Sequence, residues 1–163
     1  MCGAATLALD LGVSQRDIKY AASKLSAVSH RLELKPFING SLLIDDAYNA
    51  NPSGCLEAVN VISSFDGFKK IIVTPGLVEL GDNEYQANFA LGKAAAEKCD
   101  VLIFVGEKRS IPLVDGANSA DSAEKGDVHV VASFKDAMAL LRQLVDDKCV
   151  VLFENDLPDN YAG

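Results

Sequence analysis

The sequence contains no tryptophan, only two histidines in 163 residues, and fewer basic than acidic side chains, 15 against 23. The resulting formal charge of −8 would repel a phosphate backbone, which argues against nucleic acid as a partner. No apolar run approaches the ~18 residues of a membrane span, and the first residues lack the basic segment and apolar core of a secretion signal. We therefore expect a soluble cytoplasmic protein.

Cysteine is present, but not in arrangements that bind metals. Cys2, Cys55, Cys99 and Cys149 stand far apart, no C-x-x-C pair occurs, and the two histidines cannot complete a metal shell. We expect reduced thiols in structural positions and no metal site. The signatures G-x-x-x-x-G-K-[ST] and G-x-G-x-x-G are absent as well, so the sequence offers no complete cradle for a triphosphate.

Helices and strands alternate along most of the chain. With 49% hydrophobic residues, the length suits one compact domain with a short appendage. Apolar spacing predicts two helices at the start, after which Asn39-Gly40 signals a β-hairpin. The alternation that follows predicts an α/β, Rossmann-like fold with a mostly parallel sheet and helices on both faces. The expected helices are 4–11, 15–25, 53–65, 85–98 and 134–145, and the expected strands are 32–37, 41–44, 70–73, 101–105, 128–132 and 149–153.

Two segments carry weaker signals. Residues 112–127 are rich in Ser, Gly, Asp and Ala, which favours a surface loop with room for a short helix. Residues 154–159 follow the last strand with acids and a proline, which suits a solvated tail.

The strongest functional signal is the run Asp45-Asp46-Ala47-Tyr48-Asn49-Ala50-Asn51-Pro52. It follows the apolar run 42–44, and ligands of open α/β sheets gather at the carboxyl ends of strands. Neighbouring strand residues point to opposite faces, so only one of Asp45 and Asp46 can face a given site. The hairpin would bring Arg31 beside Asp46, and an arginine for phosphate with a carboxylate for ribose hydroxyls suggests a nucleotide. The alternative is an ordinary surface ion pair.

Further polar side chains follow the same pattern at strand ends. Tyr48, Asn49 and Asn51 could orient an acceptor substrate, although Asn-x-Asn-Pro also suits a loop and helix start in which side chains bond to their own backbone. Glu79, in the turn after the next strand, could receive an ammonium group, or it could be a solvated turn residue. His30 has no nucleophile that a sequence rule pairs with it.

Three of these motifs together resemble successive motifs of the Mur ligases: Ser29-His30-Arg31, the run 45–52, and Glu79-Leu80-Gly81. Residues 1–28 resemble the helical end of the central ATPase domain, and residues 29–163 resemble the C-terminal Rossmann-like domain. Within the family, the run 45–52 most resembles the branch that adds D-alanyl-D-alanine to a UDP-N-acetylmuramoyl tripeptide in peptidoglycan synthesis.

The resemblance implies a bacterial three-domain parent enzyme. Its first domain binds the UDP-sugar peptide, its central domain holds ATP and magnesium, and its third domain closes over them. ATP converts the peptide carboxylate to an acyl phosphate, which the incoming amine attacks to form an amide. By position, Arg31 would reach the phosphates and Asp46 would hold the ribose, whereas Tyr48 lies where a sister branch has a phosphate-contacting lysine. Asn49, Asn51 and Glu79 are candidates for substrate contacts.

The sequence also departs from the family pattern. The central-domain lysine and magnesium ligands are absent, so no complete catalytic set is present and we expect the chain alone to be inactive. Asn88 stands where many relatives have histidine, and Thr74-Pro75-Gly76 replaces a commoner Gly-Asp pair. The alternatives are a stand-alone nucleotide-binding or interaction module, or a ligase domain of the cyanophycin synthetase or lipid II amidating type.

Overall fold

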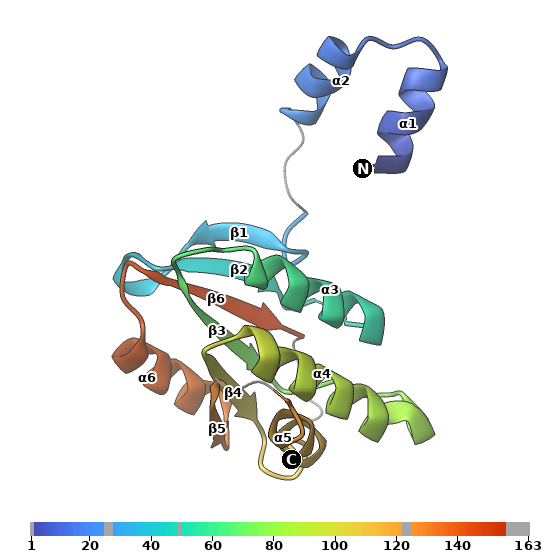
Figure 1. Cartoon of the computed structure of the whole chain (residues 1–163). Coiled ribbons are helices and arrows are strands. Elements are labelled where there is room, and N and C mark those ends of the chain that lie inside the picture. The colour runs from blue at the N-terminus through green and yellow to red at the C-terminus, as the bar shows by residue number, and fades with distance from the viewer. Residues whose placement is uncertain (1, 25–27, 49, 122–124, 156–163) are drawn as a thin grey trace.

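The computed structural model describes residues 2–24, 28–48, 50–121 and 125–155 (Figure 1). Helical and extended elements alternate from the hairpin onward, and most lie within a few residues of their predicted positions. In chain order they are α1 Cys2–Asp10, α2 Gln15–Ala22, β1 Glu33–Pro36, η1 Ile38–Gly40, β2 Leu42–Asp46, α3 Pro52–Ser63, β3 Lys69–Thr74, η2 Gly81–Asn83, α4 Glu84–Lys98, β4 Val101–Val105, α5 Ile111–Asn118, β5 Asp127–Val131, α6 Phe134–Leu144 and β6 Cys149–Glu154.

The strands form one six-stranded sheet in the order β1-β2-β6-β3-β4-β5. The pair β1 and β2 is antiparallel, whereas all other neighbours are parallel. The last strand lies between β2 and β3, so that Asp46 is aligned with Glu154 and Val73 with Phe153. The predicted Rossmann-like α/β fold with a mostly parallel sheet is confirmed.

Helices cover both faces of the sheet. One face packs against α3, α4 and α5, whose buried side chains join those of Ile44, Ile72 and Leu152 in one core cluster. The other face packs against α6 and includes Leu43 and Val151. Because successive strand residues point to opposite faces, the central strands must be apolar throughout to be buried on both sides.

The hairpin forms, but its turn is longer than predicted. Pro36 pairs with Leu42, and the intervening residues include the short 3₁₀ turn η1. Asn39 and Gly40 have positive φ angles of 55° and 82°, as an Asn-Gly turn requires. The Asn39 side chain donates a hydrogen bond of 3.1 Å to the carbonyl of Val145. That distant contact after α6 stabilises the longer connection.

The short helix that residues 112–127 had room for is present as α5, but it is buried in the core rather than part of a surface loop. In α5, Leu113, Gly116 and Ala117 are buried. A Cβ on Gly92 of α4 would lie 2.0 Å from the Leu113 carbonyl oxygen, and one on Gly116 would lie 2.0 Å from that of Phe89. The helices α4 and α5 therefore cross in backbone contact, which only glycine permits at these positions.

The helices α1 and α2 stand apart from the sheet (Figure 1). Their apolar side chains are exposed, with Leu7, Leu11 and Tyr20 at 60%, 75% and 65%. Ser14 caps α2 by accepting a hydrogen bond from the Asp17 amide. Within the described ranges, no helix is long and apolar enough to cross a membrane.

Cys55, Cys99 and Cys149 are free and buried, as expected for structural thiols. The side chain of Cys2 lies outside the described part of the chain.

Candidate functional site

The structure brings Arg31, Asp46 and Tyr48 together at the carboxyl end of β2. The half-buried Asp46 accepts a hydrogen bond of 3.0 Å from the backbone N–H of Leu32 through Oδ1. The turn that makes this possible is tight, because His30 and Leu32 have positive φ angles of 58° and 49°. The guanidinium of Arg31 lies over the Tyr48 ring, 5.1 Å from its centroid.

This arrangement suits the anionic and hydroxyl groups of a nucleotide. The side chains of Arg31 and Tyr48 are both exposed, and a guanidinium carries five donors in a planar fork that matches phosphate oxygens. The Asp46 carboxylate can accept several hydrogen bonds in addition to the one from Leu32. The strand end thus offers donors and acceptors side by side.

Asp45, the neighbouring carboxylate, has a different environment on the opposite face of β2. It is 5% exposed, and its Oδ2 contacts the Lys35 ammonium and the His30 Nδ1, the latter at 2.9 Å. Burial would raise the pKa of Asp45, but hydrogen bonds from Lys35 and the Ala47 amide outweigh it, and the pKa lies below its usual value. Asp45 therefore holds the hairpin together and gives His30 a structural partner.

The prediction of a solvated tail over residues 154–159 is wrong for its first residue, Glu154. Glu154 is 1% exposed because it continues β6 and lies beside Asp46. Burial, together with the negative charge of Asp46, raises the pKa of Glu154 to about 7, although the Cys55 thiol opposes the shift. Residues 156–159 of the predicted tail lie outside the described part of the chain.

Asn155 connects three structural elements at the same edge of the sheet. Its backbone N–H donates to the Asp46 carbonyl at 3.4 Å, and its side-chain Nδ2 donates to the Gly76 carbonyl at 2.7 Å. The loop after β3 is thereby tied to the end of β2 across β6. Neither Glu154 nor Asn155 was among the residues predicted for the site.

Glu79 lies in the loop after β3, where it is exposed and has a φ angle of 63°. Asn88 of α4 holds this loop, since its Oδ1 accepts from the Leu77 amide at 2.7 Å and its Nδ2 donates to the Leu77 carbonyl at 2.9 Å. A Cβ on Gly76 would lie 2.5 Å from the same Oδ1. Asn88 and Gly76, both departures from the family pattern, therefore shape the loop together. A substrate contact by Glu79 stays a prediction.

Asn51 caps the helix α3. Its Oδ1 accepts hydrogen bonds from the Gly54 amide at 2.9 Å and the Ser53 hydroxyl at 2.8 Å, so one end of its side chain has a structural role. A contact to substrate stays a prediction for this residue. Asn49, the other predicted amide, lies outside the described residues.

A pocket of about 300 Å³ opens between the loops that follow β3 and β4. It combines the apolar Leu77 and Pro112 with charges of both signs. Its lining residues are Leu77, Glu84, Tyr85, Asn88, Lys108, Arg109 and Pro112.

Comparison with known proteins matches this chain to one family. Residues 30–154 match the family described as Mur ligase, glutamate ligase domain, and the chain belongs to this family. Among curated proteins it is similar to the UDP-N-acetylmuramoyl-tripeptide--D-alanyl-D-alanine ligases of Escherichia coli, with 32% identity over 64% of the chain, and Bacillus subtilis, with 27% identity over 88%. The chain spans 23% and 31% of the length of these relatives.

Solved structures give the same result. A crystal structure of MurF from Acinetobacter baumannii superposes with a TM-score of 0.71 and 26% identity, covering 93% of this chain and 32% of that one. MurF from Thermotoga maritima, solved in complex with ADP, has a TM-score of 0.64 and 22% identity, covering 84% of this chain and 30% of that one. With only 22% identity, the likeness to the Thermotoga maritima structure shows a shared fold and nothing more.

Proposed function

We propose that this chain is the C-terminal domain of an ATP-dependent ligase that joins D-alanyl-D-alanine to a UDP-N-acetylmuramoyl tripeptide through an acyl phosphate. The observation that carries the proposal is the grouping of Arg31, Asp46 and Tyr48 at a strand end within a domain of the Mur ligase family. The named relatives support this branch over the cyanophycin synthetase and lipid II amidating types.

Arg31, Asp46 and Tyr48 have distinct roles in this proposal. The Arg31 guanidinium donates to phosphate oxygens, and the Asp46 carboxylate accepts from the ribose hydroxyls of ATP. Tyr48 holds the guanidinium of Arg31 in place through its ring. ATP supplies the phosphoryl group that activates the peptide carboxylate. Closure of this domain over the other two would exclude water from that reactive group.

Magnesium has no role on this chain in the proposal. The described ranges contain no group of three or more His, Cys, Asp or Glu side chains that could hold a metal ion. As the family resemblance implies, we assign the ion to the central domain of the parent enzyme, together with most contacts to ATP.

For the acceptor, we propose that Glu79 receives the amine of D-alanyl-D-alanine and that Asn49 and Asn51 orient the substrate. The pocket beside the Glu79 loop has Lys108 and Arg109 in its wall, whose positive charges suit the dipeptide carboxylate.

We further propose that residues 1–28 belong to the central ATPase domain and residues 29–163 form the C-terminal domain. The exposed Leu7, Leu11 and Tyr20 support this division, because apolar helix faces are normally covered by a domain core. From these proposed substrates we also propose that the parent enzyme acts in the bacterial cytoplasm.

A chimaera tests the proposal. The N-terminal and central domains of the Bacillus subtilis relative, joined to residues 29–163 of this chain, should release phosphate only when D-alanyl-D-alanine is present and should form the amide product. The chain alone should form none. A folded chimaera that binds ATP yet forms no amide would contradict the proposal, as would amide formation by the isolated chain.

A further inference from the structure

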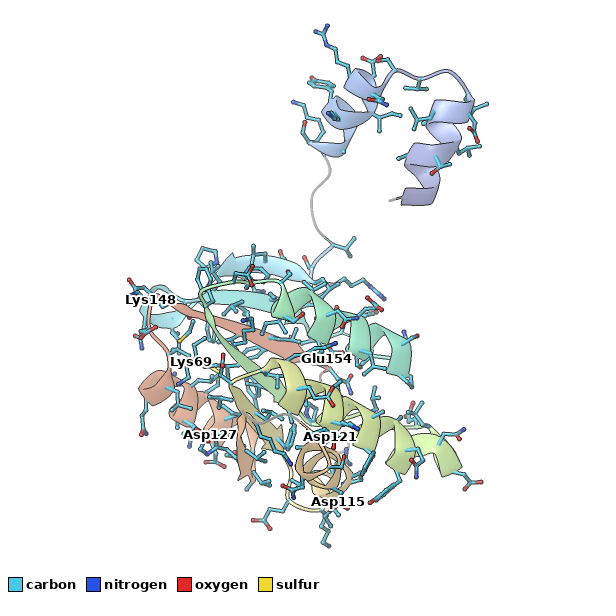
Figure 2. All side chains as sticks on the ribbon, viewed as in Figure 1. Lys69, Asp115, Asp121, Asp127, Lys148 and Glu154 are labelled. Carbon is cyan, nitrogen blue, oxygen red and sulfur yellow. The ribbon has the colours of Figure 1, made fainter. Side chains whose placement is uncertain are left out.

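A buried carboxyl group lies at the edge of the proposed nucleotide site and has no role in the function described so far. Figure 2 shows Glu154 at the carboxyl end of β6, where it is 1% exposed. Both of its carboxyl oxygens are buried, and neither makes a hydrogen bond of normal geometry within the described ranges, although the Cys55 thiol and the Asp46 carboxylate lie close enough to affect its pKa. An ionised carboxylate is highly unfavourable in such a place, so the protonated acid is the form that fits.

A protonated Glu154 needs an acceptor, and the elements around it offer one strong candidate. From β2, Asp46 is aligned with Glu154 in the parallel pair, which puts both side chains on the same face. From α3, the Cys55 thiol is adjacent. Burial, then the charges of Glu154 and Asp46, raises the pKa of that thiol, so it stays neutral. The last residue of β3, Thr74, does not titrate.

We propose that Glu154, in its protonated form, donates a hydrogen bond to the Asp46 carboxylate and thereby positions it for the ribose hydroxyls of the nucleotide. The inference rests on the proposed nucleotide-binding role of Asp46. In this arrangement Asp46 is held from two sides, by the Leu32 N–H, which donates at 3.0 Å, and by the Glu154 O–H. Glu154 is then a positioning residue, since it acts only through Asp46.

The arrangement makes nucleotide binding sensitive to pH. When Glu154 loses its proton, two carboxylates lie side by side and repel each other, and Asp46 turns away from its binding orientation. Asp45 cannot compensate, because Lys35 and His30 hold it on the other face of β2. Affinity for the nucleotide should therefore fall as the pH rises through neutrality.

Titration of the chimaera with ATP between pH 6 and pH 8.5, followed by calorimetry, tests the inference, because the central domain supplies the remaining contacts to ATP. We expect the wild-type affinity to fall about tenfold over this range, which corresponds to one pKa unit of coupling. Glu154→Gln keeps a donor but cannot ionise, so its affinity should be high and independent of pH. Glu154→Leu has a side chain of similar size but no hydrogen-bond donor. This variant should bind ATP about tenfold more weakly than the wild type at pH 6, again without pH dependence. Glu97→Gln, at an exposed position in α4, is the matched control and should follow the wild type.

A second measurement does not depend on the nucleotide. In carbon-13 spectra of the side-chain carboxyl groups, the signal that Glu154→Gln removes should titrate near pH 7.

The outcomes separate the two proposals. Equal binding by Glu154→Gln and Glu154→Leu, or a Glu154 signal that titrates near its ordinary value, would overturn the positioning role while leaving the proposed function intact. An Asp46→Ala chimaera that binds ATP as tightly as the unmutated chimaera would instead contradict the nucleotide role of Asp46, and the positioning role would fall with it.

Discussion

The two faces of β2 at its carboxyl end put the same chemical group to different uses. On the α6 side, Asp45 is ionised and held by Lys35 and His30, so its charge stabilises the hairpin. On the α3 side, Asp46 faces a buried acid and accepts from the backbone beside Arg31. Adjacent residues in a strand can therefore serve stability and binding separately, because the pleat directs them into different environments.

Removing the binding carboxylate should have the largest effect. In the chimaera, Asp46→Ala should lower kcat/KM for ATP by about 10² to 10³-fold, the range seen when one preorganised polar group is lost from an active site. Steady-state kinetics measures the change. Asp45→Ala is the matched variant on the other face of β2. An equal loss of activity in Asp45→Ala would contradict the division of roles between the two carboxylates.

The acid beside Asp46 should make stability depend on pH between the ordinary glutamate pKa and about 7. The pKa of Glu154 is raised to about 7, so the folded state favours the protonated form. Stability is retained at low pH and declines as the pH rises from the ordinary glutamate pKa to about 7. Glu154→Gln should therefore be more stable than the wild type by about 3 kcal/mol at pH 8 and equal to it at pH 4.5. Urea unfolding at both pH values measures the difference, and a constant difference would contradict the prediction.

Asp45 should make stability depend on pH in the opposite direction. Its pKa is lowered, so it contributes stability above its ordinary pKa and loses that contribution as the pH falls. Asp45→Asn should cost about 1 to 2 kcal/mol at pH 7, because its partners Lys35 and His30 are partly solvated. This loss of stability should shrink in acid. In the chimaera, Asp45→Asn should change ligase activity by no more than about twofold, because the activation barrier should change little.

The smallest expected effect comes from substitutions of Asn51, which separate its helix-capping role from its proposed contact with substrate. Asn51→Ala should lower stability by about 1 kcal/mol through loss of the α3 cap, whereas Asn51→Ser, which also caps, should retain it. Thermal unfolding measures this cost. If Asn51→Ser keeps full ligase activity in the chimaera, the proposed substrate contact is wrong. If it loses activity at unchanged stability, the amide itself contacts substrate.

Local patterns in the sequence predicted the elements of the fold well, because the apolar spacing of residues such as those in β4 reflects burial directly. Where prediction failed, a distant contact decided the outcome. The turn at Asn39 depends on a bond to Val145, and the burial of α5 depends on glycines that let α4 approach. Neither contact leaves a signal in its own segment.

The arrangement of residues at the candidate site was predictable in part for the same reason. Strand parity separated Asp45 from Asp46, and the hairpin brought Arg31 near Asp46. The positions of Glu154 and Asn155 were not predictable, since they depend on the insertion of β6 between β2 and β3 and on its register with β2. An acid that follows an apolar strand looks the same in the sequence whether it is solvated or buried.

The bonds of Asn155 to Asp46 and Gly76 have a consequence for how this domain can be excised or fused. The family match ends at residue 154, so a boundary drawn there would remove the residue that links β2 to the loop after β3. A chain ended at 154 should keep its sheet but lose order at the site edge. Any hybrid enzyme or minimal domain should therefore extend at least one residue past the last strand.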